Sequence, residues 1–328
     1  MWDQTRVLVT GAGGFIGSHL TEALVRRGCT VRAFIRYNSR NGRGNLEDIA
    51  PEVLENVEII AGDLRDADVI ERAVKGCDVV FHLGALVGIP YSYQNPREVV
   101  EANILGTLNV LTAARDHGVK RIIHTSTSEV YGSARYVPID EAHPLQGQSP
   151  YSASKIGADK LVESFHASFD LPVVTVRPFN SYGPRQSARA VIPTIITQAL
   201  SKAEIHLGNT ETLRDFTFVT DTAAGFIAAA EAQGAIGYVV NVGSGSEVSI
   251  GELASMIVRT LQSPAKIVVD ETRLRPGRSE VTRLLADNRL AKEVLGWEPR
   301  VPLGQGIELT ANWIKTHLEH FQIGKYQI

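Results

Sequence analysis

The sequence predicts an α/β fold in which a doubly wound parallel sheet is followed by a smaller, mixed α/β part. Two observations support this: short apolar runs alternate with longer helical patterns in the first half of the chain, and the alternation loosens into turns and helices after Arg177 and Pro178. Repeated strand-helix-strand order makes the strands parallel, with right-handed crossovers and helices on both faces of the sheet. The predicted strands span residues 7–9, 31–35, 57–60, 79–82, 122–124 and 173–176.

Helical patterns lie between and after these strands. The first two cover residues 15–27 and 99–115, and later ones cover 191–200, 222–232, 250–261 and 304–317. The continuous apolar run at residues 238–242 has the character of a buried strand and is expected to return to the main sheet. We therefore expect a first domain at residues 1–178 with a returning segment at about 219–242, and a second domain at residues 179–218 and 243–328.

The composition argues against several classes of function. A formal net charge of −3 provides no broad positive field for nucleic acid. Cys29 and Cys77 form no Cys-x-x-Cys pair, and the nine histidines show no ligand spacing, so no metal is expected. The N-terminus lacks the features of a secretion signal and no run reaches transmembrane length, so we expect a cytoplasmic protein without a membrane partner.

A glycine-rich turn follows the first strand directly and opens the first helix. Residues 11–17 read G-A-G-G-F-I-G, with glycines at the first, fourth and seventh positions. Glycines permit a sharp turn and the close approach of a pyrophosphate, and the N–H groups at a helix start carry partial positive charge toward it. The turn predicts a dinucleotide site formed by Gly11, Gly14, Phe15, Ile16 and Gly17.

The end of the second strand bears on the choice of dinucleotide. An acidic residue there would bond a ribose 2′-hydroxyl, but residues 33–40 read A-F-I-R-Y-N-S-R and contain none. Arg36, Ser39 and Arg40 can instead bind a 2′-phosphate through charge-assisted hydrogen bonds. This favours NADP over NAD as the cofactor. The alternative is that the arginines only solvate a surface loop.

Tyr151 and Lys155 are the candidate proton-transfer pair. They lie four residues apart, so on a helix both project from one face. A free phenol has a pKa near ~10, and a neighbouring ammonium together with a cationic nicotinamide favours the phenolate. Tyr151 is therefore the predicted proton acceptor. The spacing alone is also that of an ordinary surface pair, so its meaning depends on the segments around it.

Several such segments accompany the pair. They are residues 127–132 (TSEVYG), 177–184 (RPFNSYGP), 214–221 (RDFTFVTD), 241–245 (NVGSG) and 295–299 (LGWEP). With the glycine turn and Tyr151-x-x-x-Lys155, they resemble the extended short-chain dehydrogenase/reductases that act on nucleotide sugars, over nearly the whole chain. The resemblance implies a Rossmann domain for the dinucleotide and a smaller substrate-binding domain, in the two ranges given above.

The resemblance also implies contacts with both ligands. It assigns adenine contacts to Asp63 and Leu64. Its further cofactor positions are Leu83, Ala85, Asn103, Tyr151 and Lys155, with Asn103 supporting Lys155 through water. It assigns the diphosphate of the sugar nucleotide to Asn180, Arg214 and Arg275, and the sugar to Ser92 and Glu280. Each arginine has the alternative of being an ordinary surface cation.

The Thr127-Ser128-Glu129 segment is most similar to the GDP-mannose and GDP-N-acetylglucosamine 4,6-dehydratases. In that reaction Tyr151 takes the C4 hydroxyl proton as hydride passes to the nicotinamide, Glu129 removes the C5 hydrogen, water leaves from C6, and the hydride returns there. Ser128 departs from the Thr-Asp-Glu pattern that other 4,6-dehydratases carry in this segment. Serine is too weak an acid to protonate a leaving hydroxide, so Glu129 or a bound water is the expected acid.

Other activities remain open at this point. UDP-glucuronate decarboxylases share the Thr-Ser-Glu segment, but a carboxylate at Glu280 would repel a uronic acid. A 4-epimerase and a non-enzymatic NADP-sensing module are further alternatives, the second opposed by the retained Thr127, Tyr151 and Lys155. The helices at 99–115 and 151–169 are apolar around much of their circumference, which predicts a homodimer, with burial inside one subunit as the alternative.

Overall fold

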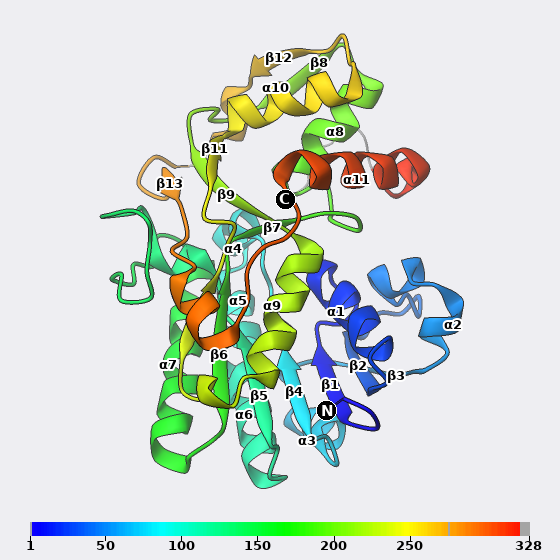
Figure 1. Cartoon of the computed structure of the whole chain (residues 1–328), viewed down its shortest axis with the longest axis vertical. Helices are drawn as coiled ribbons and strands as arrows, with labels where there is room; N and C mark the ends of the chain where they lie inside the picture. The colour runs from blue at the N-terminus through cyan, green and yellow to red at the C-terminus, as the bar shows by residue number, and fades with distance from the viewer. Residues whose placement is uncertain (1, 275, 322–328) are drawn as a thin grey trace.

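The computed structural model describes residues 2–274 and 276–321. Its main sheet has seven parallel strands in the order β10-β6-β5-β4-β1-β2-β3 (Figure 1). All six strands predicted from the sequence are present. The strands are β1 (Arg6–Thr10), β2 (Thr30–Arg36), β3 (Val57–Gly62), β4 (Val79–His82), β5 (Arg121–Thr125), β6 (Val173–Pro178) and β10 (Val239–Val242).

The order of the strands marks where a ligand is expected. The chain winds from β1 outward through β2 to β3, then returns to the other side of β1 and continues through β4, β5 and β6. Ligands of such sheets bind beyond the carboxyl ends of the strands at this switch point, between β1 and β4. β10 extends the sheet beside β6, although it follows β6 by more than sixty positions in the chain. The division into two domains stays a prediction.

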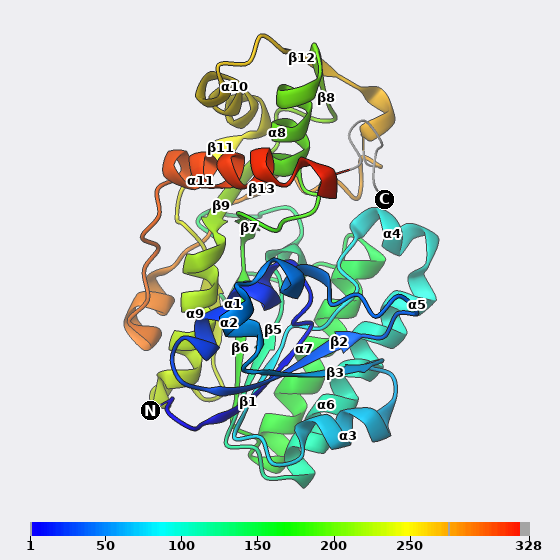
Figure 2. The same cartoon turned by 90° about the vertical axis from the view of Figure 1, so that its right-hand side faces the viewer.

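Helices cover both faces of the sheet (Figure 2). One layer contains α1 (Phe15–Val25), α2 (Pro51–Leu54) and α9 (Val219–Glu231), and the other contains α3 (Ala67–Val74), α6 (Gly106–Asp116) and α7 (Pro150–Phe169). Within β1, Val7 and Val9 pack into the core under α1 and α9, whereas Leu8 between them packs into the core under α6 and α7. Burial of both faces explains why the strands are continuous apolar runs.

The helix predicted at residues 99–115 is present and contains one wider turn. It consists of α5 (Pro96–Val100), a π-helical turn at Glu101–Leu105 and α6. Asn103 lies in this turn, and its amide bonds the backbone of Leu86 and the hydroxyl of Ser154. These tertiary bonds accompany the wider turn, and such turns are frequent at functional sites.

The smaller part of the molecule lies beyond the carboxyl ends of the main strands (Figures 1 and 2). Three helices, α8 (Val191–Ser201), α10 (Ile250–Leu261) and α11 (Leu303–Thr316), pack around a core of their own. The accompanying strands form a parallel pair, β8 (Glu204–Leu207) with β12 (Lys266–Val269), and a mixed sheet of β7 (Asn180–Tyr182), β9 (Leu213–Phe218), β11 (Glu247–Ser249) and β13 (Arg283–Leu284). The predicted fold class, a doubly wound sheet with a mixed α/β addition, is confirmed.

The described residues contain neither a membrane-spanning helix nor a metal-binding cluster. Across residues 2–274 and 276–321, no helix is both long and apolar enough to cross a membrane. The same residues contain no group of three or more His, Cys, Asp or Glu arranged to hold a metal ion. Cys29 and Cys77 are buried free thiols, and burial raises the pKa of each.

Candidate active site

The glycine turn forms a cradle that tolerates no side chain at two positions. Gly11 has φ +70°, and a Cβ on it would lie 2.8 Å from the Cα of Gly84. A Cβ on Gly17 would lie 2.2 Å from the carbonyl oxygen of Gly11. Gly14 is the N-cap of α1 and places no side chain over the first turn, which Phe15 and Ile16 begin. Backbone packed this closely at a helix start fits the pyrophosphate of a dinucleotide.

A loop from the end of β2 folds back over this cradle. The N–H of Asn45 donates to the carbonyl of Gly13 at 2.9 Å, and the Asn45 amide donates to the carbonyl of Arg185 at 2.8 Å. Ser39 and Arg40 are exposed in the same loop. The loop thus connects the end of β2, where selectivity for the dinucleotide is predicted, to the turn that follows β7.

Arg36 ends β2 with an exposed side chain. Its guanidinium forms an ion pair with Glu98 on α5 at 3.0 Å, and Glu98 also accepts a hydrogen bond from the hydroxyl of Tyr91. The Arg36 side chain is 62% exposed, so the ion pair contributes little to stability.

The predicted adenine contacts follow β3. Asp63 forms an ion pair with Arg65 at 2.7 Å, and the hydrogen bond from the Arg65 side chain lowers the pKa of the Asp63 carboxyl. The side chain of Leu64 packs so closely that a Cβ on either Gly84 or Gly106 would lie 2.8 Å from it.

The other predicted cofactor positions follow β4. The N–H of Leu83 donates to the carbonyl of Thr10 at the end of β1, and Ala85 lies two residues further along this connection. Asn103 is buried, with its amide oxygen accepting from the N–H of Leu86 and its nitrogen donating to Leu86 and Ser154. The described contacts therefore tie Asn103 to Ser154, the neighbour of Lys155, and a water-mediated link to Lys155 itself stays a prediction.

Helix α7 carries the candidate proton-transfer pair. Ser149 and Ser152 form a capping box at its start, which fixes the first turn, where Tyr151 lies. Tyr151 and Lys155 are both buried. The ammonium of Lys155 donates to the carbonyl of Thr125 at 2.6 Å, at the end of β5. Two elements distant in sequence, β5 and α7, thus come together at this point.

Burial controls the titration of both groups. It raises the pKa of Tyr151, a hydrogen bond with Thr127 opposes this, and the charge of Glu129 adds to it. Burial lowers the pKa of Lys155 to about 8, and the charge of Asp159 opposes this. Burial thus favours the protonated form of the Tyr151 phenol, and the hydrogen bond with Thr127 does not outweigh it.

Thr127, Ser128 and Glu129 occupy a short turn directly after β5. Thr127 caps the 3₁₀ turn Ser128–Tyr131, and its hydroxyl accepts a hydrogen bond from the N–H of Glu129 at 3.2 Å. Ser128 is buried, whereas Glu129 is half-buried. Since the Glu129 charge acts on the Tyr151 phenol, the structure brings an acid, a phenol and an ammonium to one place.

The predicted substrate contacts lie in the smaller part. Asn180 on β7 donates from its side chain to the carbonyl of Asp215 on β9, at 3.2 Å. On the same strand, Arg214 donates to the carbonyl of Val281 at 2.6 Å and pairs with Glu280 at 3.5 Å. The structure therefore brings Asn180, Arg214 and Glu280 to adjacent strands and loops.

The segment around Glu280 is tethered to the catalytic elements. The carbonyl of Glu280 accepts from the hydroxyl of Ser133, just after the Thr127 turn. The hydroxyl of Ser279 donates to the carbonyl of Gln148, just before α7. Glu280 thus belongs to a segment that connects the smaller part to both catalytic segments.

The other two predicted substrate contacts are Ser92 and Arg275. Ser92 is fully buried in α4 (Ile89–Gln94), and its hydroxyl donates to the carbonyl of Ile89 at 2.7 Å, so its contact with a sugar stays a prediction without support from this geometry. Arg275 lies outside the described residues.

Sequence reasoning missed Asp159 and Arg177 as parts of the site. They form a buried ion pair at 2.9 Å, and Asp159 also accepts from His124 and Ser126 at the end of β5. A signal was present, because Asp159 follows Lys155 by four residues on one helix face.

Comparison with known proteins identifies the family. A family model described as GDP-mannose 4,6 dehydratase matches residues 8–310. The chain belongs to this family. The predicted membership among the short-chain dehydrogenase/reductases that modify nucleotide sugars is thereby confirmed.

Relatives of this family member catalyse different reactions. The chain is 35% identical over 320 residues to a UDP-N-acetyl-alpha-D-glucosaminuronate decarboxylase of Bacillus cytotoxicus, covering 94% of this chain and 98% of the relative. A UDP-glucuronic acid 4-epimerase from Bacillus cereus, solved with NAD, is 30% identical with a TM-score of 0.88 over 95% of this chain and 100% of that one. A dTDP-glucose 4,6-dehydratase from Streptomyces venezuelae, also solved with NAD, is 29% identical with a TM-score of 0.87 over 97% and 99%. The chain is therefore a nucleotide-sugar-modifying enzyme, and these relatives span three reactions.

Proposed function

We propose that the chain is a nucleotide-sugar 4,6-dehydratase that forms an NDP-4-keto-6-deoxy sugar. The observation that supports this is the position of Glu129, whose N–H donates to the hydroxyl of Thr127, the residue that is hydrogen-bonded to the buried Tyr151 phenol. A 4-epimerisation needs proton transfer only at the C4 oxygen, whereas elimination across C5 and C6 needs a second acid-base group beside it.

The residues take the following roles. Tyr151 removes the proton of the C4 hydroxyl, with Thr127 hydrogen-bonded to the phenol and Lys155 held by the carbonyl of Thr125. When bound, the nicotinamide would supply an acceptor for the C4 hydride and a donor of that hydride to C6, and its positive charge would favour the phenolate. The 4-keto group acidifies the C5 hydrogen, which Glu129 removes as a proton.

Glu129 also returns this proton to the leaving group. Ser128 is buried and is too weak an acid to protonate a departing hydroxide. Glu129 becomes a carboxylic acid when it takes the C5 proton, and it then protonates the C6 hydroxyl, which leaves as water. One carboxyl group thus serves both steps of the elimination. As the hydride returns to C6, C5 takes a proton from solvent, and Tyr151 releases to solvent the proton that it took from the C4 hydroxyl, so that both groups end in their starting protonation states.

The residues around the sugar favour a neutral sugar over a uronic acid. Decarboxylation at C5 requires a cation dedicated to the substrate carboxylate. Arg214 forms an ion pair with Glu280 and donates to the carbonyl of Val281. The carboxylate of Glu280 therefore lies beside the positive charge of Arg214. A substrate carboxylate beside Glu280 would be repelled.

Product mass tests the proposed reaction. Purified protein is incubated separately with nucleoside diphosphate derivatives of glucose, mannose, N-acetylglucosamine and glucuronate, and the products are weighed by mass spectrometry. The proposal expects one neutral sugar nucleotide to lose the mass of one water. Loss of carbon dioxide from the glucuronate, or an isomer of unchanged mass, would overturn it.

We further propose that the cofactor is NADP, with Arg36, Ser39 and Arg40 around its 2′-phosphate. Arg36→Ala is expected to weaken NADP binding about tenfold or more, because a lost charge-assisted hydrogen bond costs roughly 1.5–3 kcal/mol. NAD binding is expected to change little. Isothermal titration calorimetry measures both affinities.

Arg26→Ala is the matched control for this experiment, since Arg26 is an exposed arginine at the far end of α1, paired with Glu22. It should leave both affinities unchanged. Tighter binding of NAD than of NADP by the unaltered protein would contradict the NADP assignment.

We also propose a homodimer formed through the layer of α5, α6 and α7. Leu111, Val162 and Phe165, which the sequence places on apolar faces, pack inside the subunit, but Val100 and Leu105 remain exposed on the same layer. Light scattering should give twice the mass of one chain, and Leu105→Glu should halve it. A single-chain mass for the unaltered protein would contradict the dimer.

A further inference from the structure

Asp159 is a buried carboxylate one helical turn beyond Lys155 on α7. Its side chain is 5% exposed and accepts four hydrogen bonds from three side chains. One oxygen accepts from Nε2 of His124 at 3.1 Å, and the other accepts from the hydroxyl of Ser126 at 2.8 Å and from Nε and Nη2 of Arg177 at 3.3 and 2.9 Å. Every partner is a donor, which is the arrangement that an ionised carboxylate requires.

The partners of Asp159 surround the residue that holds Lys155. The Lys155 ammonium donates to the carbonyl of Thr125, and His124 and Ser126 are the neighbours of Thr125 on either side. Asp159 therefore bonds α7 to the end of β5 immediately next to the Lys155 contact. The same end of β5 leads directly into the Thr127 turn.

We propose that Asp159 is a positioning residue of the reaction, which locks α7 against the end of β5 and supplies the counter-charge of the buried Lys155 ammonium. The inference rests on the proposed use of Tyr151 and Lys155 in proton transfer. It adds a residue that touches neither sugar nor cofactor and acts through Lys155.

The other titratable groups around Asp159 are Arg177, His124 and His82. Arg177, from β6, donates to Asp159 and to the hydroxyl of Tyr131. His124 on β5 and His82 on β4 are both buried, and burial lowers the pKa of each, so they stay neutral near pH 7. Among the described residues, Asp159 is the charged group that acts on the pKa of Lys155.

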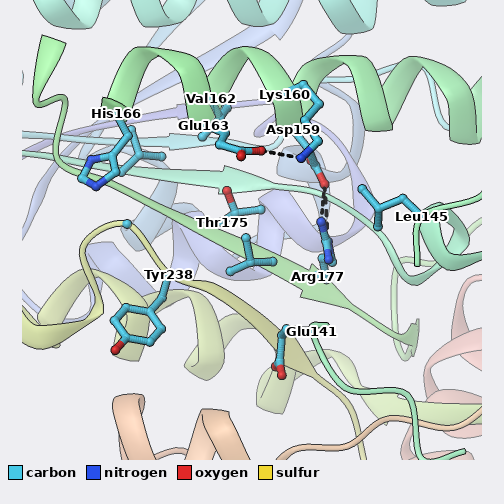
Figure 3. Close-up of a pocket in the computed structure, with 13 residues that line it drawn as sticks. Glu141, Leu145, Asp159, Lys160, Val162, Glu163, His166, Thr175, Arg177 and Tyr238 are labelled. Atoms are coloured by element: carbon cyan, nitrogen blue, oxygen red, sulfur yellow. Dashed lines mark hydrogen bonds and ion pairs between the residues drawn. The ribbon is translucent and has the colours of Figure 1, made fainter. Parts of the chain in front are cut away.

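Asp159 and Arg177 also line a cavity of about 360 Å³ (Figure 3). The other charged residues that line it are Glu141, Lys160 and Glu163. Lys160 and Glu163 on α7 pair with each other at 2.5 Å there. Across the cavity, Glu141 accepts from the N–H of Asn241, and burial raises the pKa of its carboxyl. Figure 3 shows Asp159 reaching from α7 to Arg177 beneath the helix, while Lys160 and Glu163 bond each other along it.

The direction of the effect follows from charge. A carboxylate favours the protonated form of a neighbouring amine, so removing it lowers the pKa of Lys155 below its value of about 8. Asp159 also raises the pKa of Tyr151, so its removal lowers that pKa as well. Both groups then lose their protons at lower pH.

The test is the titration of Lys155 itself, followed by nuclear magnetic resonance of isotope-labelled lysine side chains and assigned with Lys155→Met. Asp159→Asn is expected to lower the Lys155 midpoint by about one pH unit. Glu163→Gln is the matched control, because it removes an exposed carboxylate one further turn along α7 and should leave the midpoint unchanged. An unchanged midpoint in Asp159→Asn would overturn the proposal.

Asp159→Asn leaves Arg177 buried without its counter-charge, which is destabilising. The double variant Asp159→Asn with Arg177→Gln removes both charges of the pair and keeps the test available if the single variant does not fold. Arg177 does not act on the pKa of Lys155, so the double variant should give the same lowered midpoint.

The pH dependence of turnover gives the second readout. The optimum of the Asp159 variants should move to lower pH, whereas a merely structural role would lower the rate at every pH without moving the optimum. An inactive unaltered protein would count against the proposed function. An active one with an unmoved optimum in the variants would count against the role of Asp159.

Discussion

Tyr151→Phe is expected to lower turnover by about 10²- to 10⁴-fold, the range typical of losing a general base. The change removes one hydroxyl, and its partner Thr127 is itself a hydroxyl that can bond water instead. Cofactor binding should persist, because the glycine cradle and Arg36 are on other elements. Steady-state rates with the substrate identified by mass spectrometry, together with a calorimetric titration of the dinucleotide, measure the two effects separately.

Tyr136→Phe is the matched control. Tyr136 is exposed, and its hydroxyl donates to Asp140 outside the site. Its loss should leave turnover near that of the unaltered protein. Retention of full turnover in Tyr151→Phe would show that another group takes the C4 proton and would remove the basis for the proposed roles on α7.

Glu129→Gln is expected to stop the reaction after oxidation at C4, again with a loss of about 10²- to 10⁴-fold in product formation. Tyr151 and Lys155 are intact in this variant, so the 4-keto sugar still forms, but no group removes the C5 proton. Quenching with borodeuteride and weighing the sugar nucleotide should reveal a ketone that retains its C6 hydroxyl. In heavy water, the unaltered protein should place deuterium on the product, and the variant should not.

Glu308→Gln, which removes an exposed carboxylate on α11, controls for loss of charge alone and should react normally. Normal product formation by Glu129→Gln would contradict the elimination step assigned to Glu129. It would show that another group removes the C5 proton.

The sequence carried most of the information about the sheet. The strands β1, β4, β5 and β6 are buried on both faces, so their residues form continuous apolar runs that are visible without any partner. Gly11 and Gly17 were equally visible, because close backbone packing excludes every other residue type at their positions. The prediction that Tyr151 and Lys155 lie on one helix face depends only on their spacing, which is a local property of the sequence.

The features that sequence reasoning missed depend on contacts between distant segments. The π-helical turn accompanies the bond of Asn103 to Ser154, 51 positions away, and hydrophobic periodicity does not register it. Asp159 acquires its role from His124 and Ser126, more than thirty positions earlier. The local sequence pattern predicts the helix face on which such a side chain lies, but it does not predict which distant residues the side chain contacts.

Choice of cofactor shows the same limit. The sequence displays Arg36 at the end of the second strand, but not Glu98, which comes from α5 and pairs with its guanidinium. A 2′-phosphate that binds the Arg36 guanidinium would have to replace the carboxylate of Glu98 as its partner. We therefore expect the preference between NADP and NAD to depend also on Glu98, which lies 62 positions away from Arg36 in the chain.

The central claim is that C4 is oxidised transiently and that the same hydride returns to C6. A sugar nucleotide carrying deuterium at C4 tests this directly, with the position of the label in the product read by nuclear magnetic resonance. The proposed 4,6-dehydratase should give a product that has lost one water and carries the deuterium at C6. An isomer of unchanged mass with deuterium at C4 would contradict the claim in favour of epimerisation, and loss of carbon dioxide would contradict it in favour of decarboxylation.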